Sequence, residues 1–303
     1  FLEVNMKKLL FTGGTGFLGK NMIPILEKQY EVTTCGITLG NIIKTNLAKE
    51  VPNLIQHYDI VLHAAGKAHS VPKNISEEQV FFDINLQGTI NLCAALEKSG
   101  VPNSFIFISS VSVYGLDQGE LVTEKHSLFA KDPYGVSKIQ AESLVQEWCK
   151  RHNVVCTILR LPLIVGANPP GNLGAMIRGI DKGYYFNIAG GKAKKSMVLA
   201  KDVAKILLKA SEIGGVYNLT DGYHPSFYEF SNTISKQYRK SRIINLPFTI
   251  AKSIALVGDV IGNSFPLDSN KLRKITSELT FDDSKARKIL GWNPNKVLDY
   301  YKK

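Results

Sequence analysis

The sequence is poor in the residues that hold small or metal-bound proteins together. Only four of its 303 residues are cysteines, and no two of them form a CxxC pair. This spacing favours reduced structural thiols over disulfides or metal ligands. His63 and His69 also have no companion histidine or carboxylate at ligand spacing, so we expect structural histidines and no metal site. The four cysteines are Cys35, Cys93, Cys149 and Cys156.

Long apolar runs are missing as well. The longest, Phe248 to Gly262, is interrupted by Lys252 and Asp259. It falls short of the roughly 20 residues that span a bilayer, so we expect a packed helix and no membrane span. Met6 leads directly into an expected strand, which predicts no signal peptide and a cytoplasmic protein.

Acidic residues become scarce in the second half of the chain. Residues 1–150 carry 13 Lys or Arg and 15 Asp or Glu, a net charge of −2, whereas residues 151–303 carry 24 and 11, a net charge of +13. A basic half raises the question of nucleic-acid binding. The basic residues are dispersed, do not cluster with aromatic residues and form no nucleic-acid motif. We therefore expect no nucleic-acid partner and a solvated basic face, with a few cations available to an anionic ligand.

The stretch from Lys7 to Lys20 combines a short apolar run with a burst of glycines. Leu9 to Phe11 predicts a buried strand, and the glycines predict a tight turn that opens a helix. Such a turn lets a pyrophosphate approach the backbone, and the helix N-terminus offers its N–H groups to the phosphates. A plain turn is the alternative for this motif alone. The residues expected to face a dinucleotide are Gly13, Gly16, Phe17, Leu18 and Gly19.

Strands and helices are expected to alternate along the chain. Several apolar runs predict strands, and Glu77 to Lys98 predicts a long amphipathic helix. This alternation predicts an α/β fold with a doubly wound parallel sheet. In a dinucleotide-binding unit an Asp or Glu commonly ends the second strand and binds the adenosine ribose, but Gly36 stands there, so the choice between NAD and NADP stays open. The main predicted strands are Glu31–Cys35, Asp59–Ala65, Ser104–Ser109 and Val154–Leu161.

Tyr134 and Lys138 are four residues apart, just after a helix start signal at Asp132 and Pro133. Both side chains are therefore expected on one helical face, although a pair of surface residues is the plain alternative. A lysine ammonium beside a phenol favours the phenolate and lowers the tyrosine pKa, which suits a general acid/base. Ser110, at the expected carboxyl end of a parallel strand, is placed to hold a substrate oxygen.

Five segments then occur in order: TGGTGFLG, HAAG, Asn85 with GT close behind, FISSVSVYG and YGVSK. Together they resemble the extended short-chain dehydrogenase/reductases, the NAD-dependent epimerase/dehydratase family. The resemblance covers nearly the whole chain. It implies a Rossmann-type domain that binds NAD or NADP over residues 6–166, to which residues 195–222 return. It also implies a smaller C-terminal α/β region that binds substrate, over residues 167–194 and 223–303, and a homodimer.

The resemblance implies that Ser110, Tyr134 and Lys138 are the catalytic residues. Ser110 stands four residues before Tyr114 in the family pattern, and Ser109 and Ser112 are its competitors. Tyr134 would take the proton of a sugar hydroxyl, Ser110 would bind the oxygen, and Lys138 would hold the cofactor ribose.

The resemblance also implies ligand contacts. For Asn85 the alternative interpretation is a buried polar residue without a ligand contact. For Asn172 and Lys195 it is a solvated position in a loop or strand. The further implied cofactor contacts, beside the glycine turn, Tyr134 and Lys138, are Ala64, Ala65, Gly66, Asn85, Ser109 and Leu161. The implied substrate contacts are Ser110, Ser112, Asn172, Lys195 and Arg273.

For function, the resemblance implies hydride transfer at a sugar carbon, C4 of a UDP-sugar, by an epimerase or a 4-keto-reductase of polysaccharide precursor synthesis. Sugar 4,6-dehydratases of this family follow the serine or threonine with Asp-Glu, whereas Val111 and Ser112 occupy those places here, which disfavours dehydration. A reductase of a small non-nucleotide ketone is one alternative. A non-enzymatic cofactor-sensing regulator is another, although such proteins usually lose the tyrosine or the lysine.

Overall fold

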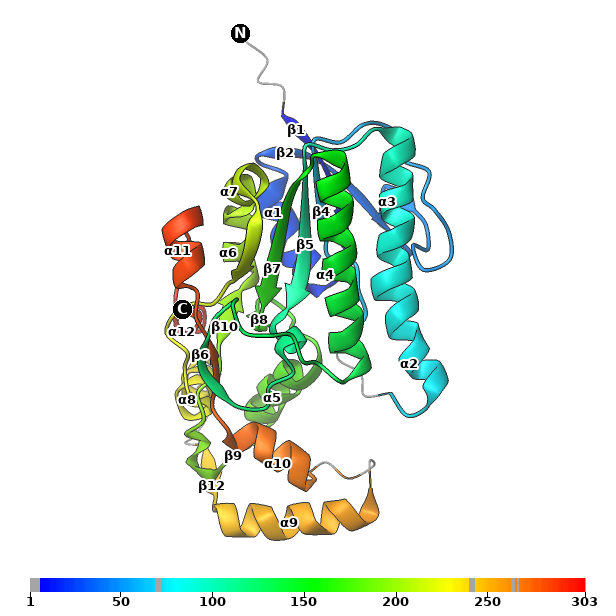
Figure 1. Cartoon of the computed structure of the whole chain (residues 1–303). Coiled ribbons are helices and arrows are strands. Elements are labelled where there is room, and N and C mark those ends of the chain that lie inside the picture. Colours follow the sequence, from blue (N-terminus) through cyan, green and yellow to red (C-terminus); the bar gives the residue numbers. More distant parts are fainter. Residues whose placement is uncertain (1–5, 69–71, 240–242, 263–264, 266, 303) are drawn as a thin grey trace.

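A computed structural model describes residues 6–68, 72–239, 243–262, 265 and 267–302 of the chain (Figure 1). His69 lies outside these residues. The strands are β1 (Lys7–Thr12), β2 (Tyr30–Gly36), β3 (Ile43–Lys44), β4 (Ile60–His63), β5 (Ser104–Ser110), β6 (Gly119–Val122), β7 (Val155–Leu161), β8 (Leu163–Val165), β9 (Phe186–Ile188), β10 (Met197–Leu199), β11 (Gly215–Asn218), β12 (Ile244–Leu246) and β13 (Leu279–Phe281). The α-helices are α1 (Phe17–Leu26), α2 (Ile75–Phe82), α3 (Gly88–Ser99), α4 (Pro133–His152), α5 (Gly171–Lys182), α6 (Ala200–Lys205), α7 (Leu207–Ile213), α8 (Phe227–Gln237), α9 (Phe248–Ile261), α10 (Ser269–Thr276), α11 (Ser284–Leu290) and α12 (Val297–Tyr300). A π-helical turn η1 (Asp83–Gln87) and the 3₁₀ turns η2 (Val111–Tyr114) and η3 (Ala189–Gly191) complete the elements.

Seven parallel strands form the central sheet, in the order β11-β7-β5-β4-β1-β2-β3. The order reverses at β1, which pairs with β2 on one side and with β4 on the other. Ligands of such sheets bind at this switch point, beyond the carboxyl ends of the strands. The predicted doubly wound parallel sheet is confirmed.

The central strands are buried on both faces, because helices cover both sides of the sheet (Figure 1). Leu9 and Phe11 pack toward α1, α6 and α7, whereas Leu10 packs toward α3 and α4. Successive side chains of a strand point to opposite faces, so an uninterrupted apolar run is what a doubly covered strand requires. This explains why β1, β4 and β5 were visible in the sequence.

The helix expected from Glu77 to Lys98 is present but not uniform. It consists of α2, the π-helical turn η1 and α3, which follow one another without a gap in the chain. Asn85 lies within η1 and is almost completely buried. A π-helical turn adds one residue to a helical turn and shifts the side chains that follow it, which is common at functional sites.

A second group of elements lies beyond the carboxyl ends of β5 and β7 (Figure 1). The strand pairs β8 with β10, β9 with β12 and β6 with β13 are found there, and α5 and α8 share a separate hydrophobic core. The expected helix at Phe248 to Gly262 is α9, which contacts α10. It is packed on one face only, through Ala251, Ala255 and Gly258.

The four cysteines are free thiols, and three of them are buried, as the sequence predicts. Among the described residues, no helix is both long and apolar enough to cross a membrane. The same residues contain no group of three or more His, Cys, Asp or Glu side chains arranged to hold a metal ion.

Candidate active site

The glycine turn joins β1 to α1 at the switch point of the sheet. Gly13 has a φ of 79°, and a Cβ on it would lie 2.7 Å from the nitrogen of Ala65. A Cβ on Gly19 would overlap the backbone of Gly14. Only glycine fits these two positions. Gly16 differs, because its φ of −72° suits any residue and a Cβ there would meet only the Gly13 oxygen, at 3.1 Å, among the described residues.

The N-terminus of α1 follows this turn directly. Gly16 is its N-cap, no described side chain caps the helix, and the first turn contains no acidic residue. The first N–H groups of the helix are therefore left for a bound anion. Phe17 is half-buried, and the side chain of Leu18 is buried in the core, so Leu18 offers only its main chain to a ligand.

A chain of hydrogen bonds fixes the loop after β4. The Thr12 hydroxyl accepts from the Ala65 N–H at 3.2 Å and lies 2.6 Å from His63 Nδ1, while His63 Nε2 lies 2.9 Å from the Thr89 hydroxyl. The Thr89 hydroxyl donates to the Asn85 carbonyl at 2.7 Å. The network assigns the proton of His63 to Nε2. Burial lowers the pKa of His63 to about 3, so this histidine is a neutral structural group.

Asn85 ties the loop after β4 to α4. Its Oδ1 accepts from the Lys67 N–H at 2.7 Å, and its Nδ2 donates to the Lys67 carbonyl at 3.2 Å and to the Ser137 hydroxyl at 2.9 Å. A Cβ on Gly66 would lie 3.0 Å from Asn85 Oδ1. All polar atoms of the Asn85 side chain thus form hydrogen bonds within the protein. This favours a role of Asn85 in positioning Ala64 to Gly66 over a direct contact between Asn85 and a cofactor.

Ser110 and Tyr134 are brought together at the carboxyl end of β5. Ser110 caps η2, with its Oγ accepting the Ser112 N–H at 3.1 Å. Tyr134 lies in the first turn of α4, whose start is capped by Asp132 through the Gly135 N–H at 3.0 Å. Burial raises the pKa of Tyr134 above its usual value, while a hydrogen bond with the Ser110 side chain lowers it. These contacts place two of the predicted catalytic groups within reach of one substrate oxygen.

Lys138 is only 5% exposed, and its ammonium points at β5. Its Nζ donates to the Ile108 carbonyl at 2.7 Å and lies 4.0 Å from the centre of the Phe107 ring. Burial lowers its pKa to about 7, and the Glu142 carboxylate partly opposes that shift. The expectation that Lys138 lowers the pKa of Tyr134 is wrong for this structure, because burial dominates the phenol and the ammonium is directed to the backbone of β5.

A buried ion pair lies behind Lys138, and the sequence analysis missed it. Arg160 binds Glu142 in a bidentate manner, with Nη2 to Oε2 at 2.6 Å and Nε to Oε1 at 3.1 Å. Arg160 also donates to the Tyr114 hydroxyl at 3.1 Å, and Tyr114 donates to Asn218 Oδ1 at 2.7 Å. The sequence signal was available, since Glu142 stands four residues after Lys138 on the helical face that carries Tyr134.

Two predicted cofactor contacts have their side chains turned away from the switch point. The Ser109 hydroxyl donates to Glu142 Oε1 at 2.5 Å, on the opposite face of β5 from Ser110. The Leu161 side chain is 2% exposed and belongs to the core cluster around α1. Only the main chain of either residue is left for a cofactor.

A cavity of about 270 Å³ opens next to Ser110. Asn172 and Lys195, both predicted to bind substrate, lie in its wall, which is otherwise largely apolar. Burial lowers the pKa of Lys195, and the Asp117 and Glu278 carboxylates oppose that shift. The lining residues are Val111, Pro162, Leu163, Asn172, Leu173, Met176, Lys195, Ser196, Phe227, Phe230, Leu279 and Phe281.

Arg273 is not part of this wall. Its guanidinium is 60% exposed and donates to Asp117 Oδ2 at 2.7 Å, and Lys274 lies 3.5 Å from the same carboxylate. Because Asp117 also acts on the charge of Lys195, this ion pair lies near the rim of the cavity. The structure therefore groups Arg273 with Asp117 and not with Asn172.

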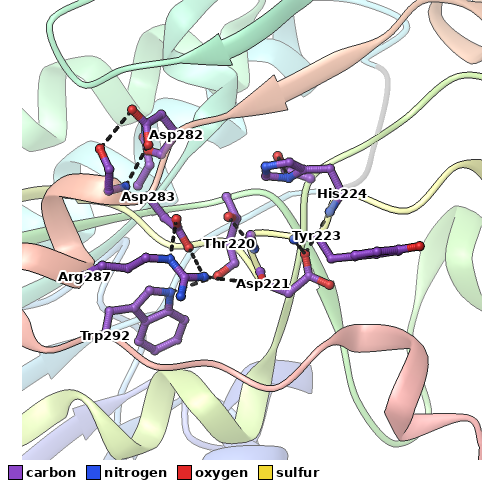
Figure 2. Close-up of polar contacts among 12 residues, drawn as sticks. Thr220, Asp221, Tyr223, His224, Asp282, Asp283, Arg287 and Trp292 are labelled. Carbon is purple, nitrogen blue, oxygen red and sulfur yellow. Dashed lines mark hydrogen bonds and ion pairs between the residues drawn. The ribbon is translucent and has the colours of Figure 1, made fainter.

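Hydrogen bonds join the loop after β11 to residues of the C-terminal segment (Figure 2). Asp221 accepts the N–H groups of Tyr223 and His224 at 3.1 and 3.2 Å, and the Trp292 indole donates to the Thr220 carbonyl at 2.9 Å. Arg287 holds Asp283 through two contacts of 2.8 and 3.0 Å. His224 Nδ1 in turn lies 2.9 Å from the hydroxyl of Ser196, a residue of the cavity wall. Trp292 thus holds the loop after β11, and His224 of that loop holds Ser196 in the cavity wall.

Neutral polar groups lie at the place where an acid commonly binds the adenosine ribose, and Lys44 of β3 is the strand partner of Gly36 there. A Cβ on Gly36 would lie 3.1 Å from Asn41 Nδ2, which donates to the Thr38 carbonyl at 2.9 Å. The Thr38 and Thr15 hydroxyls are 2.5 Å apart. Amide and hydroxyl groups can bind ribose hydroxyls, and they neither repel nor neutralise a 2′-phosphate.

The residues present therefore fit a dinucleotide. A glycine-only turn, a helix N-terminus without a side-chain cap and a neutral loop after β2 lie together at the switch point of the sheet. With Ser110 and Tyr134 at the end of β5, two strands from β1, this arrangement defines the class of nicotinamide-dependent oxidoreductases that use a tyrosine.

The chain belongs to the NAD dependent epimerase/dehydratase family, whose model matches residues 9–219. The predicted family is thus confirmed, and with it an enzyme of the NAD-dependent epimerase/dehydratase type that uses NAD or NADP. The roles of the individual site residues stay predictions.

Named relatives share the length of the chain. It is 26% identical over 298 residues to an N-acetyl-α-D-glucosaminyl-diphospho-ditrans,octacis-undecaprenol 4-epimerase of Escherichia coli O157:H7, covering 92% of this chain and 88% of the relative. It is also 26% identical over 314 residues to a UDP-glucose 4-epimerase of Vibrio cholerae, covering 96% and 92%. Among solved structures, UDP-glucose 4-epimerase of Thermotoga maritima with UDP-glucose superposes with a TM-score of 0.75 at 20% identity, covering 97% and 96%. At that identity the superposition shows the fold alone.

Proposed function

We propose that the protein is a nucleotide-sugar 4-epimerase or 4-keto-reductase that acts on a UDP-sugar in polysaccharide precursor synthesis. The observation that carries this proposal is the contact between Ser110 and Tyr134 together with a cavity whose wall contains Val111, the residue after Ser110, as well as Asn172 and Lys195. A largely apolar cavity with one amide and one cation suits a sugar carried on a diphosphate. The names of the relatives support C4 as the reacting carbon.

In this proposal Tyr134 Oη takes the proton of the C4 hydroxyl and returns a proton in the reverse step. Ser110 Oγ binds the same oxygen and stabilises the phenolate by hydrogen bonding. A bound nicotinamide would supply the acceptor and the donor of the hydride at this carbon. Lys138 is proposed to hold the cofactor ribose, and Asn85 holds the loop that positions the cofactor.

Lys195 is proposed to bind the substrate diphosphate, and Asn172 to contact the substrate beside it. Partial burial lowers the pKa of Lys195, and the negative charge of a bound diphosphate would raise it again and favour the charged ammonium. Arg273 is proposed for the entry of the substrate, because its partner Asp117 lies close to Lys195.

The diphosphate pocket is tested by thermal shift with UDP, dTDP, GDP and uncharged ketones. We expect UDP to stabilise the protein and ketones without phosphate to leave it unchanged. Lys195→Ala should lose the UDP shift, whereas Lys192→Ala, at an exposed position outside the cavity wall, should keep it. Stabilisation by ketones alone would instead favour a small-ketone reductase.

Epimerisation and 4-keto reduction are distinguished by the amount of cofactor consumed per sugar converted. An epimerase interconverts two UDP-sugars with a catalytic amount of cofactor, which proton NMR of the anomeric region follows. A 4-keto-reductase consumes one reduced cofactor per sugar, which absorbance at 340 nm follows. The absence of both activities with an intact fold would favour the cofactor-sensing regulator.

The proposal assigns the two ligands to two regions of the chain. Residues 6–166 with 195–222 would bind the dinucleotide, and residues 167–194 with 223–303 would bind the sugar nucleotide. We further propose a cytoplasmic homodimer, which light scattering of the purified protein tests.

A further inference from the structure

Helix α9 has one packed face and one open face. Ala251, Ala255 and Gly258 are buried and lie three or four residues apart, so they form a single stripe against the loop and helix that carry Leu267 and Leu272. The opposite side of the helix carries large apolar residues that no described residue covers. We call them the open face of α9: Ile250, Leu256, Val257, Val260 and Ile261, with exposures of 49%, 54%, 52%, 88% and 57%.

The open face contains almost no polar group that needs water. At 100° per residue, Thr249 and Ser253 are the small polar residues within this arc. The Ser253 hydroxyl donates to the Thr249 carbonyl at 3.2 Å, so its hydrogen bond is made within the helix. The charged residues Lys252 and Asp259 lie on one flank, between the open and packed faces. The helix thus has two apolar faces. The face of small residues packs against α10, and the face of large residues has no partner among the described residues.

The chain segment that contains α9 is basic. Among the described residues from Lys236 to Thr276, six are Lys or Arg and two are Asp. Asp268 pairs with Lys271 at 3.1 Å, and Asp117, from outside this segment, pairs with Arg273 and Lys274 at 2.7 and 3.5 Å, which leaves a net charge of +3. Large apolar residues next to a basic surface are the combination that binds an anionic lipid interface.

We propose that the open face of α9 docks on the surface of an anionic lipid bilayer, with the helix axis parallel to the membrane plane. Fourteen residues at 1.5 Å each give a length of about 21 Å, too short to cross the apolar core of about 30 Å. Phe248, 48% exposed, lies on the flank of Lys252 and Asp259 and is not part of the open face. The proposal is independent of which sugar the enzyme transforms.

A second copy of the chain fits this face less well. Two copies docked through α9 would bring two basic segments together, and like charges across an interface oppose association. Anionic headgroups, by contrast, neutralise the same charges, at about 1 kcal/mol for each Lys or Arg near the surface.

Docking would also set the orientation of the active site. The helix α10, which contacts α9, continues through two residues into β13, and Leu279 and Phe281 of β13 line the cavity that also contains Val111, the residue after Ser110. In Figure 1, α9 forms the lower edge of the molecule, at the end toward which β5 and β7 point. A membrane at this edge would face the substrate side of the sheet and not its amino-terminal side.

The test is co-sedimentation of the full-length protein with vesicles of phosphatidylcholine alone or with one quarter phosphatidylglycerol. We expect at least tenfold stronger partitioning to the anionic vesicles at low salt, and a marked loss at 300 mM NaCl. Val257→Asp combined with Val260→Asp should lower partitioning at least tenfold. The matched control is Leu208→Asp combined with Ile213→Asp, two exposed apolar residues of α7 at the other end of the molecule, which should leave it unchanged.

A second readout needs no disruptive change. Val260→Trp should show a blue-shifted emission when anionic vesicles are added, against a constant background from the buried Trp148 and Trp292. No shift, no binding of the wild type, or equal losses in both double variants would overturn the proposal. A wild-type dimer that the Val257 and Val260 changes convert to a monomer, without effect on lipid binding, would assign the open face to a second copy.

Discussion

At the scale of single residues, burial decides the charges of the catalytic pair. It raises the pKa of Tyr134 and lowers that of Lys138 to about 7, so each side chain is pushed toward its neutral form. The Ser110 hydrogen bond is the contact that favours the phenolate in this structure. The proton chemistry of the site therefore depends on neighbours that supply hydrogen bonds and not on the lysine alone.

Tyr134→Phe tests the acid/base role. The ring still packs against Phe81, 6.2 Å away between centroids, so fold and cofactor binding should be kept. Loss of the hydroxyl should lower kcat by about 10²–10⁴-fold, the usual contribution of a general acid/base. Turnover measured with an intact circular dichroism spectrum checks this, and a near-normal kcat would remove Tyr134 from the mechanism.

Lys138 should make the stability of the protein depend on pH. Its pKa falls from 10.5 to about 7 on folding, so between these values the unfolded chain binds more protons than the folded one. The free energy of unfolding then rises with pH, by at most about 1.4 kcal/mol per unit, and the full cost of burying the charge is present below pH 7.

Urea unfolding of the wild type and of Lys138→Met at pH 7, 8 and 9 measures this effect. The difference between the two proteins should shift in favour of the wild type as the pH rises. A difference that does not change with pH would show that Lys138 keeps its charge in the folded protein.

Gly36 should leave the protein with little preference between NAD and NADP. The polar groups of the loop after β2 and the glycine turn, Thr38, Asn41 and Thr15, are neutral, so the usual repulsion of a 2′-phosphate is missing. The cation beside Gly36 is Lys44, its partner on β3, and it lacks the planar fork of an arginine. We expect dissociation constants within about tenfold, or 1.4 kcal/mol, of each other in fluorescence titrations. Gly36→Asp should shift the preference toward NAD. A preference beyond about a hundredfold in the wild type would contradict this view.

At the scale of elements, the glycine turn separates two functions that the sequence alone does not distinguish. Gly13 and Gly19 are required by the backbone packed against them, whereas a Cβ on Gly16 would meet only the Gly13 oxygen, at 3.1 Å, among the described residues. The sequence motif marks all of them equally. The first two therefore serve the fold, and we propose that the third serves the approach of a ligand.

Gly16→Val and Gly19→Ala should therefore have opposite effects. Valine at 16 should keep the thermal stability and abolish dinucleotide binding in calorimetry, because its side chain fills the space of the pyrophosphate. Alanine at 19 should lower stability by about 1–3 kcal/mol, since the Gly14 backbone must move. The two variants serve as controls for each other, and normal binding by Gly16→Val would contradict the placement of the phosphates.

Some elements could be predicted from the sequence and others could not. β1, β4, β5 and β7 were predicted because strands buried on both faces are continuous apolar runs. The π-helical turn at Asn85 was not, because one extra residue in a helical turn leaves no mark on a pattern of period 3.6. The open face of α9 was also missed, since an apolar helix looks the same in sequence whether or not anything covers it.

At the scale of the whole molecule, the Arg160–Glu142 pair joins the helix of the active site to distant strands. It connects α4 to β7 directly, and through Tyr114 and Asn218 it reaches η2 and β11. Its partners are far apart in the sequence, with Glu142 and Arg160 separated by 18 residues and Tyr114 and Asn218 by 104. No sequence pattern predicts such a network, because its members come from four separate elements.

Glu142→Gln should destabilise the protein by about 3–5 kcal/mol, because it leaves the buried Arg160 charge without a partner. Glu147→Gln, at an exposed position of the same helix, should change stability by less than about 0.5 kcal/mol. Denaturant unfolding of both variants measures this. Equal effects would mean that the ion pair contributes nothing specific.

The strand order of the sheet also governs how the chain folds during synthesis. Six of the seven strands lie within the first 161 residues, whereas β11 pairs with β7 only after residues 162–214 have been made. At roughly 5–20 residues per second, that interval lasts several seconds, and the nearly complete sheet can form within it. Until β11 arrives, β7 is an unpaired apolar edge. A chain that stalls before residue 215 therefore presents the backbone of β7 as a template for aggregation with other chains.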